Sequence, residues 1–273
     1  LRLNDDLEEL LLLGDMSDNC QILVKDHGAS LRLQLDSSLP KALGLKNLGA
    51  IHCSNILEID FAQILNNYPR LRELRLWGKP GHILNFHKLS EFKELVNFST
   101  VDLFGFTAED IPKPEDLPRL SMFWMSSLPE EAAKVAKKYY KKQQDKGLNL
   151  WITKPRKAEW LAQNLDNPFR SWDGQENIST ANAKKAASLY RKTRASVIKL
   201  LENPNEDTMK HIEVLIREYT QGFNKMDKRN CFIETIERED IYDALVEILD
   251  LLPEDLGMDK EKFIEIFDEL KDF

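Results

Sequence analysis

The residues best suited to chemistry are three cysteines, five histidines and a segment from Asp227 placed like a calcium loop. A nucleophilic cysteine needs a neighbouring group that stabilises its thiolate, and Cys231 is followed by the apolar residues Phe232 and Ile233. Cys20, Cys53 and Cys231 are odd in number and far apart, which predicts free thiols in a reducing compartment. We therefore predict no catalytic cysteine and no disulfide framework.

Metal and phosphate chemistry find equally little support in the sequence. The segment from Asp227 to Arg238 lies between two predicted helices, as a calcium loop does, but it has no glycine at the sixth loop position and Arg238 stands where a bidentate glutamate is needed. His82 and His87 have no further ligands at metal spacing. Glycine-rich phosphate loops and nucleophile elbows are also missing from the sequence. We expect no catalytic residues, no metal and no cofactor.

Aromatic side chains are the remaining residues that bear on function, and their placement depends on a repeated spacing. Five segments echo the spacing L-x-x-L-x-L at intervals of 22 to 27 residues, with central apolar positions at 51, 74, 101, 123 and 148. Each segment predicts a short strand whose apolar residues point into a core and whose alternate residues point outward. We expect burial of Leu74, Leu76, Val101, Leu103, Phe123 and Met125.

The outward residues of these strands form two predicted rows. Alignment on Leu74 places one row at His52, Arg75, Asp102, Trp124 and Asn149, and the next at Ser54, Trp77, Phe104, Ser126 and Trp151. Aromatic clusters of this kind are typical of interfaces, because Trp and Tyr dominate binding hot spots. We predict a partner-binding site made of Arg75, Trp77, Asp102, Phe104, Trp124 and Trp151. The cluster also fits internal packing, either beneath residues 153–273 or inside the core if the register is shifted by one residue.

Composition narrows the class of partner. The chain has 273 residues, a net charge of −8 and 31% charged residues of both signs. The acidic surplus disfavours general nucleic-acid binding, and no apolar stretch is long enough to span a bilayer. Six lysines between residues 134 and 146 are interpreted as a solvated helix face, with a nucleic-acid patch or attraction to the acidic last forty residues as alternatives. We predict a protein partner, no nucleic acid and no membrane.

The chain is predicted to fold in four parts. Within residues 1–40, the segments Gln21–Lys25 and Leu31–Leu35 alternate with period two on either side of a turn at Asp26–Ala29, which predicts a hairpin that caps the core. Residues 41–152 carry the repeated strands and their return segments. Residues 153–178 combine turn residues with bulky aromatics, which predicts an ordered linker. Residues 179–273 predict a helical bundle. Its four helices are predicted to open at Ser179 or Thr180, Asp207, Thr235 and Asp259.

The repeated spacing resembles that of the leucine-rich-repeat family over residues 41–152. This resemblance implies an α/β fold, namely a short leucine-rich-repeat solenoid with an N-terminal hairpin cap and a C-terminal α-helical domain. In style the chain is similar to uncharacterised bacterial repeat proteins, some of which neutralise toxins. Repeats followed by helices are also similar to bacterial effector ubiquitin ligases, whose catalytic cysteine is followed two residues later by Asp. Ile233 stands at that position after Cys231.

Together these patterns predict a non-enzymatic, cytoplasmic protein-binding module. Its concave repeat face, its acidic helical domain, or both would recognise a protein partner, and toxin neutralisation (an immunity role) is the narrower form of this hypothesis. The alternative is an enzyme or effector that recognises its substrate through the repeats and carries catalysis in the helical domain. A cleft in that domain with titratable groups of shifted pKa would favour the enzyme.

Overall fold

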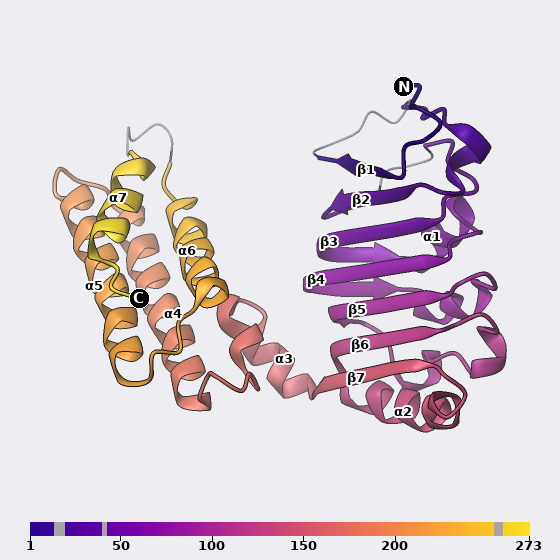
Figure 1. The fold of residues 1–273 in the computed structure, drawn as a ribbon. Helices are drawn as coiled ribbons and strands as arrows, with labels where there is room; N and C mark the ends of the chain where they lie inside the picture. The colour runs from indigo at the N-terminus through magenta and orange to yellow at the C-terminus, as the bar shows by residue number, and fades with distance from the viewer. Residues whose placement is uncertain (14–19, 40–42, 254–258) are drawn as a thin grey trace. The chain divides into compact units, whose positions relative to one another are not determined.

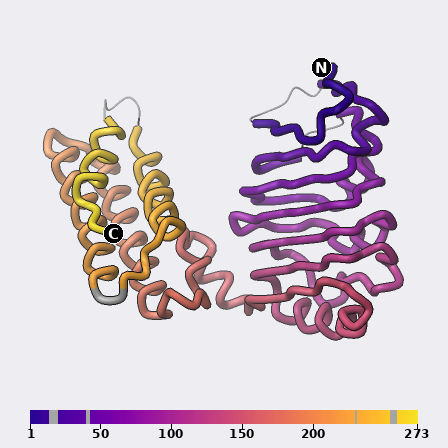
Figure 2. Tube along the Cα trace, in the orientation of Figure 1, coloured from indigo at the N-terminus to yellow at the C-terminus, as the bar shows by residue number. Residues whose placement is uncertain are grey.

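The computed structural model describes residues 1–13, 20–39, 43–253 and 259–273. The chain divides into two compact units, Leu1–Ala162 and Gln163–Phe273. The first unit contains every named strand, and the second consists of helices with their connections. Figures 1 and 2 follow the chain through both units.

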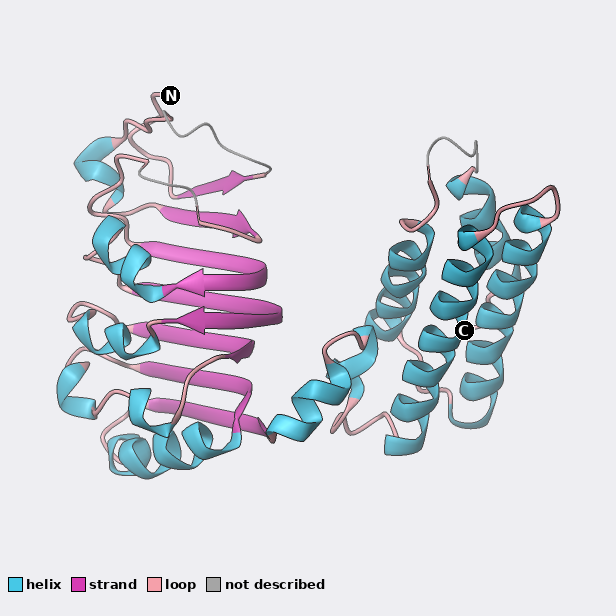
Figure 3. Cartoon of the chain, turned by 180° about the vertical axis from the view of Figure 1, so that it is seen from behind, coloured by secondary structure: helices cyan, strands magenta, loops and turns pink. Residues whose placement is uncertain are grey.

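A seven-stranded sheet forms the first unit. The strands are β1 (Glu9–Leu12), β2 (Arg32–Asp36), β3 (Ala50–Asp60), β4 (Glu73–Leu84), β5 (Asn97–Phe104), β6 (Met122–Pro129) and β7 (Asn149–Arg156). Each strand pairs in parallel with the next one along the chain, so the order in the sheet follows the sequence. Parallel neighbours need crossovers. These contain the helices α1 (Phe61–Asn67) and α2 (Glu130–Gln144) and short 3₁₀ turns, which Figure 3 shows gathered on one side of the strands.

The predicted fold class is wrong. We expected a leucine-rich-repeat solenoid with a hairpin cap, whereas the structure has a single seven-stranded, all-parallel sheet with helices, and two of its strands lie in the predicted cap. Leu33 of β2 pairs in parallel with Leu10 of β1, so no hairpin joins β2 to the segment before the turn. The predicted turn is instead a 3₁₀ helix, η1 (Lys25–Gly28), within the crossover between β1 and β2.

The inward side of the sheet is a continuous apolar ladder. One register line aligns Leu10, Leu33, Ile51, Leu74, Phe98, Phe123 and Leu150. The predicted burial is confirmed for Leu74, Leu76, Leu103, Phe123 and Met125. It is wrong for Val101, which is only partly buried, because Phe98 lies opposite Leu74 and the register of β5 therefore differs from the predicted one.

The strands bend at a common position. At this position five non-glycine residues have positive φ, and each directly follows an outward residue of its strand. They are Ser37, Asn55, Asp102, Ser127 and Lys154. We call this set the left-handed column. At the same place β4 has Gly78, where an added Cβ would lie 2.2 Å from the carbonyl oxygen of Asp102. The long strands β3 and β4 continue past the bend and pair again from Glu58 opposite His82 onward, as Figure 3 shows.

The second unit is a helical bundle in the residues described. Its long helices are α4 (Thr180–Glu202), α5 (Thr208–Asn230), α6 (Thr235–Leu249) and α7 (Lys260–Leu270). The four predicted helix starts are confirmed to within one residue. The Ser179 hydroxyl caps α4 by accepting from the Asn182 N–H. The preceding helices α3 (Ala158–Asn164) and η5 (Pro168–Trp172) lead into the bundle, where Phe169 and Trp172 pack against Phe223.

Candidate protein-binding face

The outward side chains of the strands form a surface that we call the strand face. Its central row aligns Gln34, His52, Arg75, Ser99, Trp124 and Trp151, one from each strand from β2 to β7. The row before it includes Arg32, Ala50, Glu73 and Asn97. Strand alternation explains this placement, since each of these residues lies next to an inward residue of the apolar ladder.

The structure brings together three of the six predicted site residues. Arg75, Trp124 and Trp151 share the central row. Trp77 lies in the following row, opposite Val101, with 44% of its surface exposed. The sequence predicts Trp151 in that row as well, but Trp151 lies directly opposite Trp124 in the central row.

The placements of Asp102 and Phe104 on the outward face are wrong. Asp102 is 9% exposed and Phe104 is 6% exposed, so neither presents an open surface. The cause is the register of β5, because Ser99 rather than Asp102 lies opposite Arg75. Asp102 then falls in the left-handed column, and Phe104 lies beyond the bend, opposite His82.

Trp124 and Trp151 form an exposed aromatic pair. Their ring centroids are 5.8 Å apart at an interplanar angle of 60°, which is an edge-to-face arrangement. Trp124 is 37% exposed and Trp151 is 49% exposed. The Trp124 Nε1–H donates to the Asn149 Oδ1 at 3.1 Å, which fixes the orientation of the indole. The pair therefore offers a large apolar surface in a defined orientation.

A charged cluster centred on Glu73 occupies the other half of the strand face. The Glu73 Oε1 lies 2.5 Å from the His52 Nε2, 3.1 Å from the Arg75 Nε and 3.8 Å from the Arg32 Nε. The Asn97 Nδ2–H donates to the other carboxylate oxygen at 3.0 Å. Partial burial alone would raise the pKa of Glu73, but the hydrogen bonds from Asn97 and His52 and the charge of Arg75 outweigh it, so this pKa is lowered.

Sequence reasoning missed Glu73 and Asn97. The signal was present for Glu73, because strict alternation around Leu74 turns residues 73, 75 and 77 outward together. The sequence prediction covers only the outward positions after the central leucine. Asn97 could not be placed without the correct register of β5, which aligns it with Glu73.

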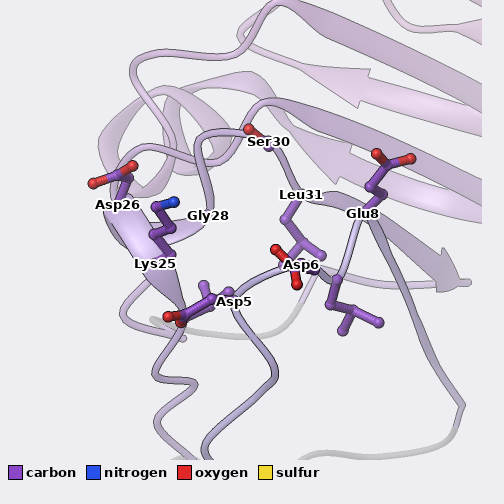
Figure 4. A pocket seen from close by; sticks show the side chains of 10 residues that line it. Asp5, Asp6, Glu8, Lys25, Asp26, Gly28, Ser30 and Leu31 are labelled. Carbon is purple, nitrogen blue, oxygen red and sulfur yellow. The ribbon is translucent and has the colours of Figure 1, made fainter.

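One hollow adjoins the charged cluster, and a second hollow lies next to the first. The first, of about 370 Å³, is lined by Arg32, Arg72, Glu73 and Asn97 among others. Figure 4 shows its neighbour, of about 310 Å³, whose lining includes Asp5, Asp6, Glu8, Lys25 and Asp26. Ser30 and Leu31 line both, so the hollows are contiguous. Their mixed charges suit polar side chains of a partner.

Comparison of this chain with family models, with curated proteins and with solved structures finds no match. No relative therefore supports the resemblance to leucine-rich-repeat proteins or to effector ubiquitin ligases. Function has to be argued from the residues themselves.

The described parts of the chain contain no group of three or more His, Cys, Asp or Glu residues able to hold a metal ion. None of their helices is long and apolar enough to cross a membrane. In the helical bundle three titratable groups have raised pKa values, and each has an internal hydrogen-bond partner. The Tyr219 hydroxyl donates to the Ile241 carbonyl, the Tyr190 hydroxyl donates to the Glu247 carboxylate at 3.2 Å, and Asp240 accepts from the Trp172 indole. The enzyme alternative stays a prediction.

The thiols differ in their surroundings. Cys20, Cys53 and Cys231 are all free, and burial raises the pKa of Cys53 to about 12, with the charge of Asp36 adding to the effect. Cys231 is exposed and ends helix α5 with φ of 44°. A left-handed residue at this position usually is glycine, so the role of Cys231 in the described structure is that of a helix end.

We expect Cys231→Ala to leave partner binding unchanged and Cys231→Gly to raise the free energy of unfolding by about 0.5–1 kcal/mol, because glycine adopts positive φ without steric cost. Urea unfolding of the two variants measures the difference between them. A loss of partner binding in Cys231→Ala, with stability intact, would instead assign the thiol a functional role.

Proposed function

We propose that this chain is a non-enzymatic protein-binding module that recognises a protein partner through the strand face. The observation that carries the proposal is the Trp124–Trp151 pair, held edge to face and exposed beside the Glu73 cluster. Contiguous exposed aromatics are unusual on a surface that meets only water. Indole rings are also the side chains most enriched among residues that dominate binding energy.

The two halves of the strand face have different roles in this proposal. The indole pair provides the apolar anchor, since burial of each ring removes a large area from water at little cost in side-chain entropy. The Glu73 cluster provides orientation, because Arg75 and His52 are already held by the carboxylate before a partner arrives. A partner that places an apolar side chain on the indoles and a hydrogen-bonding group near Arg75 fits both.

We further propose that the protein works in the cytoplasm. The three free thiols, one buried and two partly or fully exposed, support a reducing compartment. Toxin neutralisation is the narrower form of the proposal, in which the bound partner is a toxin and binding blocks its active surface. A toxin gene adjacent to the gene for this chain, and loss of toxicity on co-expression, are the results expected of that form.

The test is the double variant Trp124→Ala/Trp151→Ala in the full-length chain. Proteins captured from the native source by the wild type are identified, purified and titrated against each variant. We expect the double variant to weaken binding of the identified partner by about 30-fold or more, which corresponds to about 2 kcal/mol.

Tyr242→Ala is the control, because Tyr242 is 36% exposed, close to the 37% of Trp124, and belongs to helix α6 of the second unit. It should change the affinity by less than about twofold. Equal affinity of wild type and double variant, with both folded by circular dichroism, would exclude the strand face as the binding site.

A further inference from the structure

The strand face is divided into a charged half over β2 to β4 and an uncharged half over β5 to β7. The outward residues of the charged half include Arg32, Asp36, Glu73 and Arg75. The outward residues of the uncharged half lie in three aligned rows, namely Asn97, Met122 and Asn149, then Ser99, Trp124 and Trp151, and then Val101, Ser126 and Thr153. None of these nine residues is charged, although 31% of the residues in the chain are.

The apolar part of this surface reaches across four strands. Trp77 of β4 lies opposite Val101 of β5, and Trp124 of β6 lies opposite Trp151 of β7. Val101 is the next outward residue after Ser99, which is the neighbour of Trp124. Four neighbouring strands span about 14 Å, since adjacent strands lie about 4.8 Å apart. An extended segment of about four residues covers that distance.

The polar side chains of the uncharged half are largely occupied by hydrogen bonds within the chain. These bonds run from Trp124 to Asn149 and from Thr153 to Ser126, both at 3.1 Å, and from Asn97 to Glu73 at 3.0 Å. Ser99 and Ser126 are also buried. The contact that this half offers to a partner is therefore mostly apolar.

We propose that the uncharged half binds an uncharged, apolar segment of the protein partner, an inference that rests on the proposed function. A charged side chain placed against this surface would lose its water without gaining a counter-charge, which costs free energy. An apolar side chain gives up no hydrogen bonds there and gains contact with the indoles. The surface thus selects against charged segments at the place where it binds. Charged groups of the partner belong over the Glu73 cluster instead.

The same features favour a protein segment over a nucleic acid or a glycan. A nucleic acid needs cations opposite its phosphates, and the nine residues of the uncharged half supply none. The Trp124 and Trp151 rings meet at 60°, so they form an angled surface rather than one flat platform for stacked bases or sugar rings. A glycan also needs hydrogen-bonding side chains that are not already paired within the chain.

The experiment selects peptides of about twelve residues from a random phage-displayed library on the full-length chain, after removal of phages that bind Trp124→Ala/Trp151→Ala. We expect Asp, Glu, Lys and Arg together to occur in the selected peptides at less than about one third of their frequency in the library. Charged residues at the library frequency would overturn the inference and leave the proposed function in place. Failure to select any peptide that distinguishes the wild type from the double variant would also overturn it, whereas titration of the captured partner decides the proposed function separately.

Charge insertion tests the same surface with one selected peptide, labelled with fluorescein and titrated by fluorescence anisotropy. Thr153 is the next outward residue after Trp151 on β7 and is partly buried. We expect Thr153→Glu and Thr153→Lys each to weaken binding by about fivefold or more, because an apolar segment desolvates a charge of either sign. A charged peptide would respond to the two variants in opposite directions.

Gln34→Glu and Gln34→Lys are the matched controls, because Gln34 is a partly buried outward residue of β2 in the charged half. Each should change the affinity by less than about twofold, with all variants folded by circular dichroism. Three results would overturn the inference: stronger binding in either Thr153 variant, equal losses in the Gln34 and Thr153 variants, or complete displacement of the peptide by cellohexaose at equimolar concentration.

Discussion

Leu74→Ala is expected to lower the free energy of unfolding by about 2–5 kcal/mol, through the lost burial of the side chain and the cavity left behind. Leu74 is 0% exposed and occupies the centre of the inward ladder, with Ile51 on one side and Phe98 on the other. Parallel strands on both sides hold the neighbouring backbone in place, so the cavity cannot close by a local shift. Urea unfolding followed by circular dichroism gives the value.

Leu57→Ala is the control for this measurement, because Leu57 lies on the same sheet in β3 with 65% of its surface exposed. Its loss should stay below about 0.5 kcal/mol. A loss below about 1 kcal/mol for Leu74→Ala would mean that the ladder does not support the sheet as described.

Glu73→Ala is expected to lower the free energy of unfolding by about 1–2 kcal/mol, because it leaves the partly exposed charges of Arg75 and Arg32 without their shared carboxylate. Removal of one charged group from such a cluster lowers the free energy of unfolding by more than the intact cluster contributes, since the remaining groups stay partly desolvated. Glu58→Ala, at an exposed position of β3, is the matched control and should have little effect.

The contribution of Glu73 should depend on pH in a defined direction. Its pKa is lowered in the folded state from an ordinary value of 4.5, so the carboxylate stabilises the fold fully above about pH 4.5. The stabilisation is lost as the pH falls through the lowered folded-state pKa. The difference in unfolding free energy between wild type and Glu73→Ala should therefore be constant near neutrality and shrink in acid. A difference that grows in acid would contradict the described cluster.

The sequence was sufficient for the parallel strands wherever leucine spacing was unambiguous. Positions 51, 74 and 123 lie on the inward ladder as expected. In β5 two patterns compete for the inward positions. The pattern Phe98-x-x-Val101-x-Leu103 contains more apolar residues than the pattern Leu95-x-x-Phe98-x-Thr100. The structure uses the latter, with buried Thr100 at the position that the L-x-x-L-x-L spacing gives to its last leucine. Local pattern could not decide this, because the choice depends on the neighbours on both sides of the strand.

The prediction for the N-terminal strands was wrong for a different reason. Leu7, Leu10 and Leu12 have the L-x-x-L-x-L spacing, but the period-two alternation around the turn near Asp26 favoured a local hairpin. Parallel pairing between β1 and β2 requires a partner more than twenty residues away, which short-range periodicity does not register. The Glu73 cluster could not be predicted for the same reason. Its members come from β2 to β5, and only the register of these strands shows that they lie together.

The sequential order of the sheet also shapes how the chain can fold. Each strand pairs only with strands next to it in the sequence, so every new pairing closes a loop of modest length. Such an arrangement has no late step in which distant ends of the chain must find each other, and growth can proceed strand by strand from any pair already formed. The two outermost strands then have one neighbour each and should open first, which makes the amide protons of β1 and β7 the fastest to exchange with solvent and those of β4 the slowest.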